Sequence, residues 1–304
     1  MSPSRHARVS ARIRRGFTLV EIVITLTILG IVGAGLVKLI LVQARFSESQ
    51  MALRNARTVS RNAMNIMLTD LRMVQDKGGL IAASPESVTV RIPLAFGLVC
   101  TTGAPAISLL PVDSAMSAMA VYAGYAVRDS ISGEYSYTPT ASPTPVNNLT
   151  TITVTPNPCT MAGISPTTYG TRTSRIVSLS DVPSGTSNVG WPAFIYQVVT
   201  YKFAASTAFP GKNRRGLWRL VKSSNPAAPV TDEIIAPFDS ATAKFRFYVL
   251  NADVAQDAVP ANLNDVRGVE LVLAGSSNQP LSAGAQAKQA TMVTGVFFKN
   301  RRDP

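Results

Sequence analysis

The octapeptide RRGFTLVE, residues 14–21, decides the fold of the N-terminal part of this chain, because it opens a continuous apolar run over residues 17–42. This run contains no proline and only two charged residues, Glu21 near its start and Lys38 near its end. About 20 apolar residues in an α-helix cross a hydrocarbon core of roughly 30 Å. We therefore predict a membrane-spanning helix over residues 17–42.

The glutamate at position 21 is out of place in such a helix. A carboxylate a few residues inside an apolar span is costly and normally marks a partner that neutralises it. In an ordinary secretory signal the cleavage site also follows the apolar segment. Here the apolar run begins directly after Gly16, and no acid precedes that glycine. The segment before it is instead basic, with Arg5, Arg8, Arg12, Arg14 and Arg15.

The hexapeptide GFTLVE, residues 16–21, resembles the processing site of type IV prepilins and type II secretion pseudopilins. The resemblance implies that prepilin peptidase removes a leader, residues 1–16, by cutting after Gly16. It also implies N-methylation of the new N-terminal residue, Phe17, and contact of Glu21 with the N-terminal amine of a neighbouring subunit. Opposite charges that meet in a low dielectric offset each other's burial cost. A plain signal anchor with an incidental glutamate is the alternative.

The helix can continue beyond the membrane, because no proline occurs between residues 4 and 84. Over residues 43–79 we predict an amphipathic continuation that ends at Gly78-Gly79. Its apolar stripe comprises Leu53, Ala56, Ser60, Ala63, Met67, Leu71 and Val74. The residues predicted to lie off this stripe are Arg54, Arg57, Arg61 and Asp70. We expect the stripe to pack on a domain core, with a bare coiled-coil contact as the alternative.

After Gly79 the hydrophobic period changes from helical to alternating, which predicts an extracytoplasmic β-rich domain over residues 80–304. Strands are expected over 87–92, 119–127, 194–203, 216–222, 244–250, 267–273 and 291–299. A long surface excursion is expected over 138–170. The short connections favour antiparallel pairing. The predicted fold class is α+β, with a long N-terminal helix, half transmembrane and half amphipathic, packed on a C-terminal antiparallel β-sheet.

The order of these elements is similar to that of the larger minor pilins of the PilW type and of the J-type minor pseudopilin of type II secretion. The stretches that carry this likeness include Ala56-Arg57, Thr69-Asp70-Leu71-Arg72, Tyr201-Lys202-Phe203, Leu217-Trp218-Arg219, Phe245-Arg246-Phe247 and Phe298-Lys299-Asn300-Arg301. The likeness implies a minor, priming or tip subunit. It would be held once across the bacterial inner membrane with its C-terminal domain outside the cytoplasm, and would then join other pilins or pseudopilins in a filament. A membrane-tethered binding or adhesion module that never assembles is the alternative function.

The two cysteines, Cys100 and Cys159, both follow the apolar run. Basic residues lie on both sides of this run, so the charge rule alone does not orient it, but the prepilin resemblance implies that the cysteines lie outside the cytoplasm. An oxidising compartment permits a disulfide between them, which would close a loop of about 60 residues and add about 2 to 4 kcal/mol. Two unpaired buried thiols are the alternative.

Catalytic and metal chemistry find little support in the composition. The single histidine, His6, lies in the predicted leader, so a processed chain would lack Ser-His-Asp triads and histidine-bearing zinc sites. We therefore expect no enzyme activity and no cofactor. Asp232-Glu233 and the trio Asp253, Asp257 and Asp265 could offer oxygen ligands to calcium, but we expect solvated turn carboxylates because their spacing matches no known loop.

The basic residues do not by themselves indicate nucleic acid. The formal charge of +12 falls to +7 once the five leader arginines are subtracted. Lys212, Arg214, Arg215 and Arg219 could contact DNA phosphates, as a DNA-uptake pilus would require. A basic hairpin tip kept soluble by its charge is the interpretation that we favour.

Overall fold

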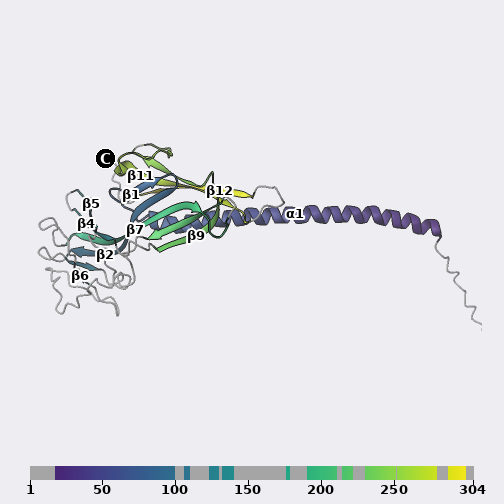
Figure 1. Cartoon of the computed structure of the whole chain (residues 1–304), viewed down its shortest axis with the longest axis horizontal. Helices are drawn as coiled ribbons and strands as arrows, with labels where there is room; N and C mark the ends of the chain where they lie inside the picture. The colour runs from purple at the N-terminus through teal and green to yellow at the C-terminus, as the bar shows by residue number, and fades with distance from the viewer. Residues whose placement is uncertain are drawn as a thin grey trace, which may run out of the picture. The chain divides into compact units, whose positions relative to one another are not determined.

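The computed structural model describes residues 18–99, 106–109, 123–129, 132–139, 176–178, 190–210, 214–221, 230–250, 252–278 and 287–298 (Figure 1). Gly16, Phe17, Cys100, Cys159 and Lys212 lie outside these ranges, so the predicted processing site and disulfide stay predictions. The chain divides into two compact units, residues 1–51 and 52–304.

Helix α1 (Leu19–Leu71) is continuous, and its first part lies in the first unit. In this part the apolar side chains are exposed, with Leu19 at 79% and Ile31 at 74%. Within the described residues α1 is the one helix long and apolar enough to cross a membrane. An apolar surface of this kind is stable only when lipid or other protein covers it.

The second part of α1 packs on the sheet of the second unit. Its buried residues are Ala56, Ser60, Ala63, Met67 and Leu71, as predicted for the stripe, whereas Leu53 is only half-buried. The helix ends at Leu71 and does not reach Gly78-Gly79 as predicted. The N–H groups of Met73 and Val74 donate to carbonyls three residues back, which tightens the chain into a turn. Val74 is buried in this turn and not in the helix.

The rest of the second unit is an antiparallel sheet. Its strands are β1 (Leu80–Ser84), β2 (Ser87–Val99), β3 (Ala106–Leu109), β4 (Gly124–Arg128), β5 (Tyr135–Pro139), β6 (Ile176–Ser178), β7 (Pro192–Ala205), β8 (Arg214–Val221), β9 (Val230–Asp239), β10 (Lys244–Val249), β11 (Val266–Ser276) and β12 (Gln289–Phe297). The main path runs β10-β11-β9-β8-β7-β2-β3-β6, while β1 pairs with β2, β12 with β11, and β4 with both β5 and β7. A short 3-10 helix, η3 (Leu263–Asp265), precedes β11.

The main core lies between α1 and one face of this sheet. Met67 and Leu71 of the helix belong to the same buried cluster as Phe203, Phe238 and Phe245. The Phe203 ring lies 5.4 Å from that of Phe238 and 5.1 Å from that of Phe245, centroid to centroid. The alternation predicted for residues 244–250 is confirmed, because every second side chain of β10 enters this core.

Several strands differ from their predicted bounds. Strand β2 continues through Pro93, which pairs with Tyr196 of β7 at a bulge. Proline has no N–H to donate to a neighbouring strand. It is tolerated at position 93 because β1, on the other side of β2, pairs with β2 only as far as Val90. Of the strand predicted over 119–127, the structure describes only the part in β4. Strands β1, β3, β5, β6 and β9 were not predicted.

Candidate functional site

The N-terminus of α1 has the residues of a helix cap. Thr18 immediately precedes the helix, and the N–H of Glu21 donates to the Thr18 carbonyl at 3.1 Å and to its Oγ1 at 3.3 Å. Thr18-Leu19-Val20-Glu21 has the spacing of a capping box, in which a hydroxyl satisfies an N–H of the first turn. The cap places Glu21 in that turn, where the helix dipole favours negative charge.

Glu21 is surrounded by exposed apolar side chains and has no salt bridge among the described residues. The nearby hydroxyls need no outside partner. Thr27 donates to the carbonyls of Val23 and Ile24 at 2.9 and 2.8 Å, and Thr25 likewise donates to carbonyls one turn back. Glu21 is therefore the charged side chain at the start of the apolar run that has no salt-bridge partner among the described residues.

A buried hydroxyl ties α1 to the sheet within the second unit. Ser60 Oγ accepts the N–H of Gly275 at 2.9 Å and lies 3.0 Å from the Leu273 carbonyl oxygen and 3.1 Å from that of Ala290. A β-carbon at Gly275 would lie 2.2 Å from the Ala56 carbonyl oxygen. Glycine is needed here because helix and strand backbones approach too closely for any side chain.

A second tie involves Asp70, which was predicted to lie off the packing stripe. The Tyr201 hydroxyl donates to Asp70, and Arg219 Nη2 lies 3.3 Å from Asp70 Oδ2. Burial, and after it the Asp70 charge, raises the pKa of Tyr201 well above its usual range. Arg219 is thus held on the core side of β8 by α1 and is not part of a basic hairpin tip.

The neighbouring basic residues also have structural partners. Arg215 Nη2 pairs with Glu86 at 2.8 Å, and Arg214 Nη1 donates to the Asn278 carbonyl at 2.8 Å. Both arginines belong to strand β8 and not to a tip. These contacts account for the described part of the basic cluster without a nucleic acid.

The acidic residues predicted to be turn carboxylates have different environments. Asp232 and Glu233 lie in strand β9, so the turn assignment was wrong for this pair. Glu233 accepts hydrogen bonds from Ser206 Oγ and from the N–H groups of Thr207, at 2.8 Å, and Ala208, at 3.3 Å. Partial burial raises the pKa of this carboxyl, but the hydrogen bonds outweigh it and the net pKa is lowered.

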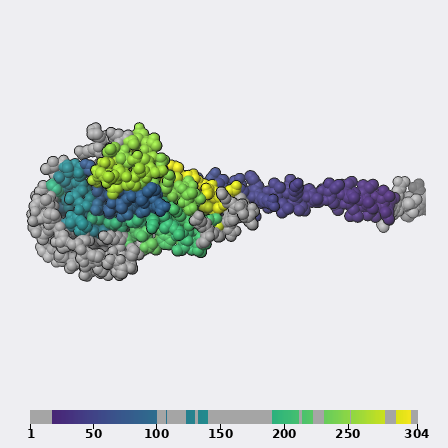
Figure 2. Space-filling model, turned by 45° about the horizontal axis from the view of Figure 1, so that its top comes forward, coloured from purple at the N-terminus to yellow at the C-terminus, as the bar shows by residue number. Residues whose placement is uncertain are grey.

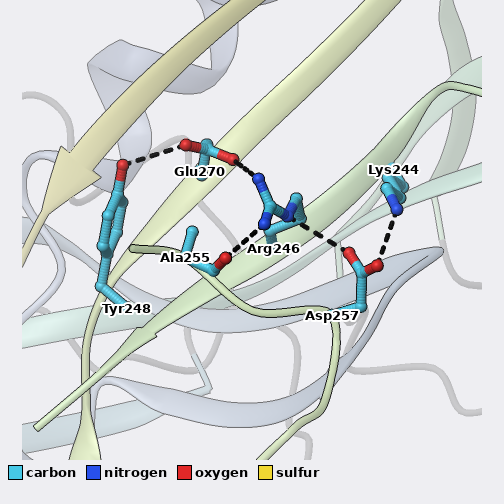
Figure 3. A network of polar contacts seen from close by, with 6 residues as sticks. All are labelled: Lys244, Arg246, Tyr248, Ala255, Asp257 and Glu270. Carbon is cyan, nitrogen blue, oxygen red and sulfur yellow. Dashed lines mark hydrogen bonds and ion pairs between the residues drawn. The ribbon is translucent and has the colours of Figure 1, made fainter. Parts of the chain in front are cut away.

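The trio Asp253, Asp257 and Asp265 is divided among separate contacts. Asp257 lies 2.8 Å from Lys244 Nζ and 3.3 Å from Arg246 Nε (Figure 3). Its pKa is lowered, chiefly by the Lys244 hydrogen bond. Asp253 Oδ1 lies 3.4 Å from Arg267 Nη2, and Asp265 lies in η3. Within the described ranges no three His, Cys, Asp or Glu side chains come together as a metal site.

Arg246 links the elements around β10. Its guanidinium lies 2.7 Å from Glu270 on β11 and donates to the Ala255 carbonyl, while the Tyr248 hydroxyl donates to Glu270 at 3.1 Å (Figure 3). The segment that contains Ala255 is thereby held against β10, and β10 is linked to β11 through Glu270. Because every charge in this network has an internal partner, we assign it a structural role.

Comparison with known proteins finds one match. Residues 11–37 match the family model of the prokaryotic N-terminal methylation motif. No curated protein and no solved structure matches the chain. The match covers residues 11–16 of the predicted leader, the predicted processing site at Gly16 and Phe17, and most of the apolar run, including Glu21.

Proposed function

From the methylation motif, which indicates a type IV prepilin-like protein, we propose that this chain is a minor pilin or pseudopilin. In this proposal prepilin peptidase cuts after Gly16, Phe17 is N-methylated, and the subunit waits in the inner membrane. It then enters a type IV pilus or a type II secretion pseudopilus in a priming or tip role. The protein acts as a structural subunit and not as an enzyme.

One observation carries the proposal: a single acid, Glu21, lies in the first turn of an exposed apolar helix and has no salt bridge within the described part of the chain. A carboxylate in that position is costly in lipid unless a cation approaches it. The amine created at Phe17 of a second subunit has the required charge and is itself in need of a partner. Pairing of the two inside a filament would set the axial position of the incoming subunit.

The packing of the second unit supports a structural role. The tie at Ser60 and Gly275 and the ion pair between Asp70 and Arg219 fasten α1 to the sheet at two levels. A helix held in this way can position the domain it belongs to within an assembly. The later stretches that resemble PilW-type and J-type subunits, and the length of the chain, favour a minor subunit.

The first experiment tests processing and assembly separately. Mass spectrometry of the N-terminus in the native host should find N-methyl-phenylalanine at position 17, and Gly16→Ala should leave the precursor intact. Glu21→Gln should be processed normally but absent from sheared filaments. Glu48→Gln is the matched control, because it makes the same change on α1 outside the apolar run.

The outcomes separate the two functions. An intact Met1, or a cut near residue 40, would contradict the filament and favour a membrane-tethered binding module. Incorporation of Glu21→Gln at the level of Glu48→Gln would contradict the role of the charge pair.

A further inference from the structure

A cleft in the second unit lies where β7 ends and β8 begins. Its volume is about 510 Å³, which falls in the range of about 300–1,000 Å³ typical of sites for small molecules. Residues of β7 to β9 are visible in green on the surface of the second unit in Figure 2. The charged side chains that line the cleft are Lys202, Arg214, Arg215 and Glu86. The cleft therefore combines the size of a ligand site with more basic than acidic groups.

The acid in this cleft neutralises only one of its cations. Arg215 Nη2 lies 2.8 Å from Glu86 Oε1. Arg214 Nη1 donates instead to the Asn278 carbonyl at 2.8 Å, which holds the guanidinium in place but supplies no negative charge. Lys202 has an exposed side chain and forms no ion pair with any described residue. Three cations against one carboxylate leave an excess of two positive charges.

The nearest acids of the sheet do not remove this excess. Glu233 is held by hydrogen bonds from residues 206–208. Asp239, opposite Arg214 in the β8–β9 ladder, accepts the N–H of Thr242 at 3.1 Å and its hydroxyl at 2.7 Å. Partial burial accordingly lowers the pKa of Arg214. A charge that is partly removed from water is normally paired, so this guanidinium favours an anion from outside the chain.

A second cleft of the same unit shows the balanced arrangement. It has a volume of about 350 Å³ and lies between the turn after α1 and the β4–β5 hairpin. Two cations, Lys77 and Arg128, and two acids, Asp76 and Glu134, line it, and Lys77 pairs with Glu134. Its charges cancel, whereas those of the cleft beside β7 and β8 do not.

The groups around the unpaired cations indicate which anion fits. Phe209 lines the cleft, with its ring centre 5.8 Å from the Arg214 guanidinium, and Ser240 adds a hydroxyl. A phosphomonoester carries about 1.5 to 2 negative charges at pH 7 on three acceptor oxygens. Arginine binds such a group through its planar fork and lysine binds it as a point charge. Two cations in a cleft match one group of this kind, and not the row of phosphates along a nucleic acid.

We propose that this cleft binds a small organic phosphomonoester, with Arg214 and Lys202 on the phosphate and Phe209 against the organic part. Arg215 keeps its partner Glu86 and forms part of the wall. The proposal concerns the second unit alone and goes beyond the filament function above.

The test is isothermal titration calorimetry of the full chain in non-ionic detergent micelles, with phenyl phosphate as the probe. We expect saturable binding to one site per chain. Lys202→Gln and Arg214→Gln should each weaken it by about tenfold or more, because each variant loses a charge-assisted hydrogen bond. Arg57→Gln is the matched control, since it removes the same charge from the exposed face of α1, and it should bind like the wild type.

Two further probes separate the charge from the ring. Benzoate keeps the ring but carries a single charge, and it should bind about tenfold more weakly than phenyl phosphate or worse. Inorganic phosphate keeps the charge without the ring, and it should bind more weakly by about threefold or more.

The exposed position of Lys202 keeps the test decisive even if Arg214→Gln fails to fold. The proposal is overturned if phenyl phosphate shows no saturable binding, if benzoate binds as tightly, or if Lys202→Gln binds as well as the wild type. Equal weakening by Arg57→Gln would also overturn it, because binding would then follow the net charge of the chain. Inorganic phosphate that binds as tightly as phenyl phosphate would overturn the part assigned to Phe209.

Discussion

Replacement of Gly275 by alanine should destabilise the second unit strongly, because the added β-carbon would meet α1. It would lie 2.2 Å from the Ala56 carbonyl oxygen and 2.6 Å from Ser60 Oγ, and both atoms are held in place by the helix. Normal contact requires a shift of about 1 Å between helix and strand. Such a shift also stretches the 2.9 Å hydrogen bond from Gly275 N to Ser60 Oγ.

The expected loss combines two effects. Overpacking of a close-packed site costs about 1–3 kcal/mol, and a weakened buried hydrogen bond costs about 1 kcal/mol more. We therefore expect the free energy of unfolding to fall by about 2–4 kcal/mol. For a unit of this size that corresponds to a melting temperature lower by roughly 5–15 °C.

The assay is urea unfolding of the full chain in micelles, followed by the fluorescence of Trp191 and Trp218, which report on the second unit. Gly295→Ala in β12 is the matched control. Its β-carbon would meet only the ring end of Tyr248, at 3.0 Å, and that side chain can move. We expect the control to lose less than about 1 kcal/mol. The reasoning is refuted if Gly275→Ala unfolds at the same urea concentration as the wild type, or if both variants lose equal stability.

Two further predictions concern the polar contacts of the second unit. Asp70→Ala should lower the free energy of unfolding by about 2 kcal/mol, because Tyr201 and Arg219 both lose their contact with the carboxylate. Tyr201→Phe should cost about 1 kcal/mol. Chemical denaturation measures both, and a loss for Asp70→Ala no larger than for the exposed Arg72→Ala would contradict the role of this cluster. Glu233 has a folded-state pKa below its unfolded value of 4.5, so its stabilising effect is complete above about pH 4.5 and is lost as the pH falls through the folded pKa. Denaturation midpoints of the wild type and Glu233→Gln should accordingly converge on acidification, and a difference that stays constant down to about pH 3 would show that the carboxylate hydrogen bonds are not the cause.

Local pattern was sufficient for most of the N-terminal helix. The apolar run with its single early acid predicted α1 and the methylation motif, because these features depend on neighbours within a few residues. The spacing of Ala56, Ser60, Ala63, Met67 and Leu71 predicted the buried face of the helix for the same reason. In the sheet, the strict alternation over residues 244–250 identified β10.

Tertiary contacts decided what local pattern could not. Strand β9 contains three acids and a proline, and its Asp232-Glu233 pair reads as a turn, yet its neighbour β8 and the loop that binds Glu233 hold it extended. Asp70 looks solvent-facing from helical spacing alone, and its partners, Tyr201 and Arg219, come from far along the chain. That β12 pairs with β11 alone among the described strands is likewise a property of sheet order. The physical reason is that hydrophobic period is written in adjacent residues, whereas strand neighbours and charge pairs are set by which distant segments the collapsed chain brings together.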